Sequence, residues 1–261
     1  MMLIAFIGHG AIASHAARRC PDGAEIIAVI CRPGREAAAR QVMGAPAITE
    51  IADLPKRPDL LIDCAGHAGL RAHGLAALRA GIDVLTVSVG ALADAELHSD
   101  LVEAAEAGQA QLSVASGAIG SLDALSAAAE GGALSVTYTG RKPPLGWRGS
   151  WAEEVLDLGA LTAAATHFEG SAREAARLYP RNANVAAAVA LAGAGLDNTR
   201  AVLIADPDAT RNIHEVQAEG AFGRFRFEIQ GNALPDNPSS SALTAMSVVR
   251  EIRRRISPIQ I

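Results

Sequence analysis

The sequence predicts an α/β fold in two parts: a parallel sheet covered by helices, then an α+β region with its own mixed or antiparallel sheet. Three observations predict it. Short apolar runs alternate with alanine-rich helical stretches up to residue 116. After residue 117 this alternation stops, and the last three β-type runs follow one another directly. Half of the 261 residues are hydrophobic and a fifth are charged, as in folded globular chains.

The first part is expected to consist of βαβ units. Its five predicted strands are continuous apolar runs, as in parallel strands that are buried on both faces. They span residues 3–7, 25–31, 59–65, 83–88 and 111–116. Helix-compatible segments lie between them, around residues 11–19, 35–42, 67–80 and 93–108. Strands that alternate with helices indicate right-handed crossovers and a parallel sheet.

The second part has a different order of elements. We expect a helix at 121–132, a strand at 134–142, a Pro/Gly-rich loop at 141–151, a helix at 182–195, and strands at 200–207, 212–220 and 221–231. Ser171 and Glu174 have the spacing of a capping box, which predicts a further helix that ends before Pro180. The last two strands alternate apolar and polar residues, which predicts an antiparallel pair with one solvated face.

A closing helix is expected over residues 239–255. It begins after Pro238 and ends in the basic run REIRRR, and arginines suit a helix C-terminus electrostatically. We expect this helix to return to the first part of the chain. The predicted domains are therefore residues 1–116 together with 239–261, and residues 117–238.

The composition argues against several functions. The formal net charge is −5 and only nine residues are aromatic, whereas base-stacking platforms place aromatic faces in a basic groove. We therefore expect no nucleic-acid partner. No apolar run approaches the roughly 18–20 residues of a membrane span, and the apolar start is too short for a signal peptide. Three cysteines in no metal-type spacing indicate free thiols, so we expect a cytoplasmic protein without a membrane partner.

A glycine-rich turn follows the first predicted strand. It precedes a helix and comprises Gly8-His9-Gly10-Ala11-Ile12-Ala13. This GxGxxA string is the Gly/Ala form of the dinucleotide fingerprint: Gly8 permits the tight turn, Gly10 admits a pyrophosphate, and Ala13 allows close helix–strand packing. The anion would lie on the free N–H groups of the helix N-terminus. The turn predicts a Rossmann domain in which these residues, with Ala11 and Ile12, bind the cofactor.

The end of the second predicted strand bears on the choice of cofactor. A site for NAD places Asp or Glu there to bind the ribose hydroxyls. This strand instead leads through Cys31 into Arg32 and, three residues later, Arg35. The two arginines either pair with a 2′-phosphate or are solvated side chains of an arginine-rich chain. We predict that NADP is accepted as well as NAD, with Arg32 as a cofactor contact.

Six strings occur in order along nearly the full chain: GHGAIA, SGAIGSLDAL, VTYTGRKPP, FEGSAREAARLYPRNANVAA, ADPDATRNIHEVQAEGAFG and NPSSSALTAMS. Together they resemble the L-aspartate dehydrogenase family. The resemblance implies a Rossmann domain completed by the C-terminal helix, an intervening α/β catalytic domain and a homodimer. It also implies oxidative deamination of L-aspartate with NAD or NADP, which gives iminoaspartate or, after hydrolysis, oxaloacetate and ammonia. The imine of this family can feed de novo NAD biosynthesis.

The resemblance assigns three residues by position. The catalytic histidine falls on His214, and cofactor contacts in the second half fall on Ala118 and Asn184. A histidine suits this chemistry, because the substrate amine must lose a proton before hydride leaves and an imidazole titrates near neutral pH. His167 is a second candidate for a role in the site.

The two carboxylates of aspartate need fixed hydrogen-bond donors. We expect these from Lys142, Asn182 and the backbone N–H groups of Gly117, Ile119 and Gly120. Lys142 is one of only two lysines in a chain with 21 arginines, and its alternative is a solvated loop position. The alternative for Asn182 is a helix cap. Histidines and acidic residues lack clustered ligand spacing, so no metal site is expected.

Two other functions remain open from the residues alone. One is a related two-domain NAD(P)-dependent reductase of another small dicarboxylate or imine, because one fold hosts many chemistries. The other is a non-catalytic dinucleotide sensor, which would keep the GxGxxA turn but would not need His214.

Overall fold

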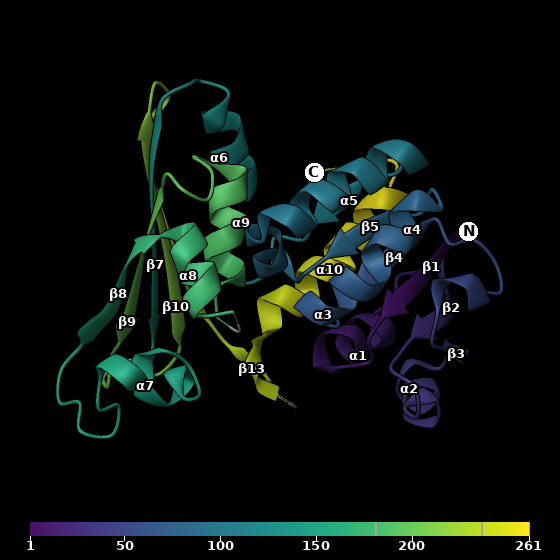
Figure 1. Ribbon diagram of the computed structural model, residues 1–261, viewed down its shortest axis with the longest axis horizontal. Coiled ribbons are helices and arrows are strands. Elements are labelled where there is room, and N and C mark those ends of the chain that lie inside the picture. Colours follow the sequence, from purple (N-terminus) through teal and green to yellow (C-terminus); the bar gives the residue numbers. More distant parts are fainter. Residues whose placement is uncertain (181, 236, 261) are drawn as a thin grey trace. The chain divides into compact units, whose positions relative to one another are not determined.

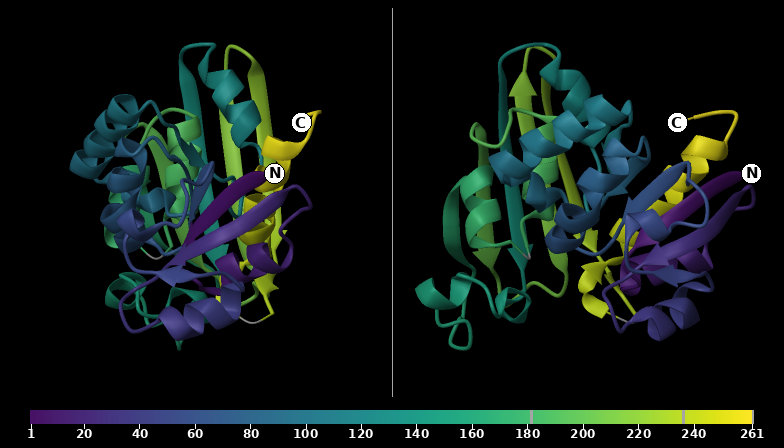
Figure 2. Two further views of the ribbon diagram at one scale, coloured as in Figure 1. Left: turned by 90° about the vertical axis from the view of Figure 1, so that its right-hand side faces the viewer. Right: turned by 45° about the vertical axis from the view of Figure 1, so that its right-hand side comes forward.

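The computed structural model describes residues 1–180, 182–235 and 237–260, and the chain divides into two compact units. The first unit comprises residues 1–117 and 244–261, and the second comprises residues 118–243. Figures 1 and 2 show a sheet with helices in each unit. The predicted α/β fold class is confirmed.

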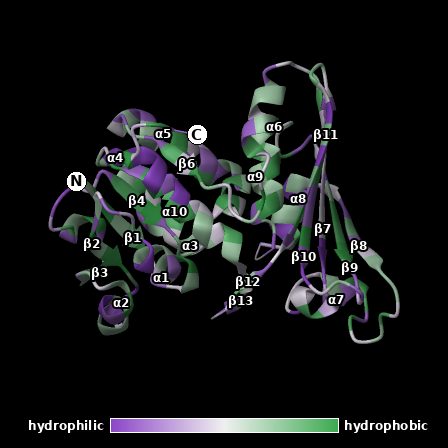
Figure 3. Ribbon diagram, turned by 180° about the vertical axis from the view of Figure 1, so that it is seen from behind, coloured by the Kyte–Doolittle hydropathy of each residue, from purple (hydrophilic) through white to green (hydrophobic). Residues whose placement is uncertain are grey.

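The sheet of the first unit is parallel, with strand order β3-β2-β1-β4-β5-β6. Its strands are β1 (Met2–Ile7), β2 (Ala24–Ile30), β3 (Ala47–Ile48), β4 (Leu60–Asp63), β5 (Asp83–Thr86) and β6 (Leu112–Val114). In Figure 3 the central strands are mostly green, the colour of hydrophobic residues. These strands are the predicted apolar runs, except that β3 is two residues long and too short to show a pattern.

The crossover helices of this unit are α1 (Ala11–Arg18), α2 (Glu36–Met43), α3 (His67–Gly69), α4 (Leu75–Arg79) and α5 (Ala95–Gly108). The single helix expected at 67–80 is wrong in one respect, because a π-helical turn at Leu70–Gly74 separates α3 from α4. Asp94 sets the start of α5: its carboxylate accepts the N–H groups of Glu96 at 3.1 Å and Leu97 at 3.2 Å.

The last helix, α10 (Ala242–Ile256), returns to the first unit, as predicted. Val248 and Ile252 are fully buried in the same apolar cluster as Ile4, Phe6 and Leu60 of the sheet. Burial of these side chains removes apolar surface from water and holds the helix against the parallel sheet.

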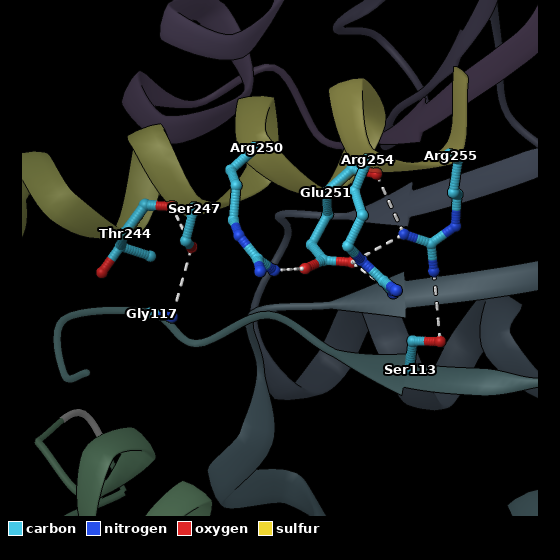
Figure 4. A network of polar contacts seen from close by, with 8 residues as sticks. All are labelled: Ser113, Gly117, Thr244, Ser247, Arg250, Glu251, Arg254 and Arg255. Atoms are coloured by element: carbon cyan, nitrogen blue, oxygen red, sulfur yellow. Dashed lines mark hydrogen bonds and ion pairs between the residues drawn. The ribbon is translucent and has the colours of Figure 1, made fainter. Parts of the chain in front are cut away.

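A polar network also joins α10 to the end of the sheet (Figure 4). Glu251, only 7% exposed, accepts hydrogen bonds from Arg254 at 3.1 Å and Arg255 at 2.8 Å. Arg255 also donates to the hydroxyl of Ser113 in β6 at 3.2 Å, and the N–H of Gly117 donates to the hydroxyl of Ser247 at 3.2 Å. The network therefore fixes the chain where it leaves β6.

The second unit contains a mixed sheet with strand order β11-β10-β7-β9-β8. Its strands are β7 (Leu134–Lys142), β8 (Ala165–Ser171), β9 (Thr199–Ala205), β10 (Asn212–Gly220) and β11 (Gly223–Gly231). β7 and β9 are parallel and the other neighbours are antiparallel, including the predicted pair of β10 and β11. β8 was not predicted. A small hairpin of β12 (Ala233–Leu234) and β13 (Asn237–Ser241) precedes α10.

Helices cover one face of this sheet. They are α6 (Leu122–Ala129), α8 (Ala172–Leu178) and α9 (Asn184–Ala192), whereas the short α7 (Ala152–Val155) lies against β8 at the end of the sheet. α9 packs against β7 and β9, with α6 and α8 beside it. Ser171 and Glu174 form the predicted capping box at the start of α8. Four of the six buried residues of α9 are alanines, which lets the helix approach the sheet closely.

Alternation along β7 and β10 decides which side chains face these helices. Tyr138, Gly140 and Lys142 occupy alternate positions of β7, and all three are buried. On the opposite face Arg226 of β11 pairs with Glu215 of β10 at 2.5 Å, in keeping with the predicted solvated face.

Candidate active site

The GxGxxA turn has the backbone geometry that a bound pyrophosphate requires. Gly8 has φ of +90°, and a Cβ added there would lie 3.0 Å from the Cβ of Ala65, so only glycine fits. A Cβ added at Gly10 meets no atom within 4 Å, which leaves open space in front of α1. Within the described residues, no side chain caps the N-terminus of α1. The fully buried Ala13 packs the helix on the sheet. These features fit a dinucleotide.

The buried carboxylate of Asp63 holds the loop segment that packs against this turn. Asp63, at the end of β4, is fully buried and accepts hydrogen bonds from the Ala65 N–H at 3.0 Å and the Thr86 hydroxyl at 2.7 Å. Burial raises the pKa of Asp63, while these donors and Ser88 oppose the rise. Since Ala65 contacts Gly8, Asp63 holds the segment that shapes the phosphate turn. Asp63 was not predicted as a site residue.

The tip of β2 carries the arginines that the sequence singled out. Arg32 and Arg35 are both exposed, and the Arg35 N–H donates to the Arg32 carbonyl in a turn at 3.1 Å. Glu36, the first residue of α2, lies near the same tip: burial, and then the charge of Glu36, raises the pKa of the Cys31 thiol. An acid is therefore present near the strand tip, directly after Arg35, where none was expected.

Lys142 ends β7 on the helix-covered face of the second unit. It is 8% exposed, and its ammonium donates to the Asn182 side-chain oxygen at 2.6 Å. The ammonium also lies 4.6 Å from the ring centroid of Trp147. Burial lowers the pKa of Lys142 to about 8. The alternative of a solvated loop lysine is therefore wrong.

His214 lies one strand away, directly opposite Gly140 of β7. Its Nδ1 is 2.8 Å from the Tyr138 hydroxyl, and the side chain is 4% exposed. Burial, and then the charge of Lys142, lowers the pKa of His214 to about 3, so the ring is neutral at pH 7. A Cβ added at Gly140 would lie 2.7 Å from the Tyr138 hydroxyl oxygen. Gly140 thus leaves room for the hydroxyl that holds the imidazole.

A second histidine belongs to the same cluster. His167 is an extra residue in β8, because Thr166 pairs with Ile204 and Phe168 with Leu203. Its Nδ1 is 2.9 Å from the Tyr179 hydroxyl. Burial, and then the charge of Lys142, lowers the pKa of His167 to about 4.

The segment at 117–120 has internal partners that bear on its predicted role. The N–H of Gly117 donates to Ser247, so it is not a free donor for a substrate. A Cβ added at Gly120 would lie 2.7 Å from the ring of Phe227, so packing alone requires this glycine. Ile119 is fully buried and Ala118 is 9% exposed.

The predicted residues therefore fall into two groups. Those of the GxGxxA turn and Arg32 lie in the first unit, and His214, Lys142 and Asn182 lie in the second. Asn184 is the first residue of α9. Among the described residues, no group of three His, Cys, Asp or Glu side chains could hold a metal ion. Of the helices described, none is long and apolar enough to cross a membrane.

Comparison with known proteins agrees with this division. Residues 123–255 match the family model for the C-terminal part of aspartate dehydrogenase, and residues 8–115 match that for the NAD-binding domain of homoserine dehydrogenase. The L-aspartate dehydrogenase of Ruegeria pomeroyi is 64% identical over 98% of this chain and 94% of its own length. The chain belongs to the aspartate dehydrogenase family.

Other members of the aspartate dehydrogenase family align over the whole chain. The L-aspartate dehydrogenase of Pseudomonas aeruginosa is 46% identical, with full coverage of both chains. The crystal structure of the Thermotoga maritima aspartate dehydrogenase superimposes with a TM-score of 0.80 at 26% identity, covering 100% of this chain and 99% of that one. The domain that holds the turn is thus of the pyridine-nucleotide-binding type.

Proposed function

We propose that this protein is an L-aspartate dehydrogenase that oxidises L-aspartate with NAD or NADP, giving iminoaspartate and, after hydrolysis, oxaloacetate and ammonia. The observation that carries the proposal is the cluster of buried Lys142 and His214 with half-buried Asn182, in a chain closely related to L-aspartate dehydrogenases. In this proposal the first compact unit is the nucleotide-binding domain and the second is the catalytic domain.

His214 is the acid/base of the proposed reaction. The bound pyridine nucleotide supplies the hydride acceptor. Hydride leaves the α-carbon only when the substrate amine is neutral, so a neutral imidazole must take one proton from the ammonium group. The neutral state of His214 meets this need, and its hydrogen bond to Tyr138 fixes the ring. The same histidine returns a proton when ammonia departs.

Substrate binding would bring His214 closer to its working pH. The charge of Lys142 contributes to the low pKa of the imidazole in the free protein. A dicarboxylate beside Lys142 offsets that charge, so the pKa of His214 rises towards neutrality when aspartate binds. A general base whose pKa lies near the operating pH is the most effective one.

The proposed donors to the two carboxylates are Lys142, Asn182 and the backbone of Ile119 and Gly120. An ammonium and an amide already in contact form a preorganised pair, which lowers the ordering cost of binding an anion. The proposed cofactor contacts are residues 8–13 and Arg32, with Ala118 and Asn184 from the second half.

The proposed use of NADP depends on Arg32. An exposed guanidinium at the tip of β2 suits a 2′-phosphate, whereas Glu36 nearby suits a ribose diol, and this combination favours a site that accepts both nucleotides. KM values for NAD and NADP in wild type and Arg32→Ala test this point. An unchanged NADP preference in the variant would remove Arg32 from the site.

We further propose a cytoplasmic homodimer whose product feeds de novo NAD biosynthesis, as the family resemblance implies. Light scattering of the purified protein measures the oligomeric state.

One assay tests the proposed activity. NAD(P)H formation is followed with L-aspartate, D-aspartate, L-glutamate and L-alanine, in wild type and His214→Ala. We expect turnover with L-aspartate alone, and a loss of about 1,000-fold in His214→Ala with nucleotide binding intact. Nucleotide binding without turnover of any amino acid would instead identify a dinucleotide sensor.

A further inference from the structure

The catalytic unit contains a second tyrosine–histidine pair. His167 contacts the Tyr179 hydroxyl through Nδ1 at 2.9 Å, as His214 contacts Tyr138 at 2.8 Å. His167 is 8% exposed. Among the residues that the structure describes, its Nε2 atom has no hydrogen-bond partner. A buried polar atom without a partner costs free energy, so a ligand that supplies the partner is favoured there.

The proton positions make this Nε2 atom a donor. Burial raises the pKa of Tyr179 to about 12, so its hydroxyl keeps the proton at neutral pH. The hydroxyl is 2.9 Å from Nδ1 and can also donate to the His167 carbonyl at 3.4 Å, and we assign its proton to the shorter contact, to Nδ1. A neutral imidazole that accepts at Nδ1 carries its own proton on Nε2. The N–H therefore points away from Tyr179 and needs an acceptor.

His167 and Lys142 lie against the same aromatic side chain. The ring centroids of His167 and Trp147 are 4.4 Å apart in an edge-on arrangement, and the Lys142 ammonium is 4.6 Å from the Trp147 centroid. Trp147 is fully buried, and its indole N–H donates to the Ile204 carbonyl at 3.0 Å, which holds the ring. The fixed Trp147 ring thus lies against both a cation and an N–H donor that has no partner among the described residues. These are the two kinds of group that bind a carboxylate best.

We propose that the Nε2–H of His167 and the ammonium of Lys142 bind the same carboxylate of the substrate, so that His167 selects for dicarboxylates. This inference rests on the proposed aspartate dehydrogenase activity. The bulge in β8 makes this contact possible, because it turns the extra side chain, His167, into the buried cluster. Tyr179 acts through His167 as a positioning residue, because its hydroxyl keeps the imidazole proton on Nε2.

The test compares His167→Leu with His167→Gln. Leucine removes the donor, whereas the amide nitrogen of glutamine reaches a position close to the lost Nε2. We expect KM for L-aspartate to rise about 10- to 100-fold in His167→Leu, with kcat within a few-fold of wild type, and to recover largely in His167→Gln. The exposed His98 lies in the other unit, so His98→Leu is the matched control and leaves KM unchanged.

A binding experiment keeps the proposal testable if a variant folds poorly. Succinate, a dicarboxylate without an amine, is titrated into ¹⁵N-histidine-labelled wild type, and an imidazole N–H resonance absent from His167→Gln should move as succinate binds. An unchanged KM in folded His167→Leu, or a His167 resonance that ignores succinate, would overturn the proposal. Absence of L-aspartate turnover in wild type would instead refute the proposed activity, whatever His167 does.

Discussion

Replacing Lys142 with methionine isolates the electrostatics of the site. Burial lowers the pKa of this lysine from 10.5 to about 8. One pKa unit corresponds to about 1.4 kcal/mol between the charged and neutral forms, so keeping the charge in the folded chain costs about 3 kcal/mol. Methionine has a similar shape and no charge. The substitution also removes the hydrogen bond to Asn182, but this lowers the free energy of unfolding only slightly, because Asn182 is half-buried and water can replace the lysine. We expect Lys142→Met to raise the free energy of unfolding at pH 7 by about 2 kcal/mol.

The pH dependence gives the sign of the effect. Between pH 8 and 10.5 the unfolded chain keeps the Lys142 proton and the folded chain releases it, so wild-type stability rises with pH over this range. The advantage of Lys142→Met should therefore be present below pH 8 and disappear towards pH 10.5. Urea unfolding followed by circular dichroism measures the difference in unfolding free energy between variant and wild type at pH 7 and at pH 10. Lys56, the exposed lysine, provides the control variant Lys56→Met, which should match wild type at both values.

The same variant should lose function while it gains stability. Removing the ammonium proposed to bind a substrate carboxylate should lower kcat/KM for L-aspartate by about 100-fold. An unfolding free energy of Lys142→Met at or below that of wild type at pH 7, with unchanged pH dependence, would refute the assignment of Lys142 as a buried, destabilised cation.

Three further substitutions test other parts of the structure. Gly10→Val should weaken nucleotide binding by at least about 10-fold, as measured by NADH fluorescence, without loss of stability, because its Cβ enters open space; unchanged affinity would contradict the turn geometry. Tyr138→Phe should lower kcat about 10-fold with little change in KM, because Nδ1 of His214, the proposed acid/base, loses its partner; a changed KM at constant kcat would speak against a positioning role. Glu251→Gln should lower the free energy of unfolding by about 2 kcal/mol at pH 7. Burial raises the pKa of Glu251, but hydrogen bonds from Arg254 and Arg255 outweigh it and lower the pKa overall. The difference in unfolding free energy should therefore shrink as pH falls through the folded pKa, and a pH-independent difference would argue against this reasoning.

Much of the fold was predictable because its signals are local. Continuous apolar runs identified the parallel strands, and the spacing of Ser171 and Glu174 located α8. Of the missed strands, β3 and β8 had no such signal. β3 is two residues long, and β8 is broken by the bulge at His167, which disrupts period-two alternation. The π-helical turn at Leu70–Gly74 likewise leaves no trace in the hydrophobic pattern.

Residues of the candidate site could be predicted from the sequence only where the residue type itself indicates the chemistry. The glycine turn and the rare lysine were visible in the sequence. Tyr138 was not, because its contact with His214 depends on the register of β7 against β10. Asp63 lay inside the predicted strand at 59–65 with no role assigned to it, and only its hydrogen bond to the loop that contacts Gly8 gives it one. Such contacts arise from strand pairing between distant segments, which a single sequence does not encode locally.

Transfer of deuterium from L-[2-²H]aspartate tests the central claim most directly. If the protein oxidises L-aspartate at its α-carbon, each turnover yields one reduced nucleotide that carries the deuterium, detected by mass spectrometry, together with one ammonia. Reduced nucleotide without deuterium, or ammonia released without nucleotide reduction, would contradict the proposed dehydrogenase.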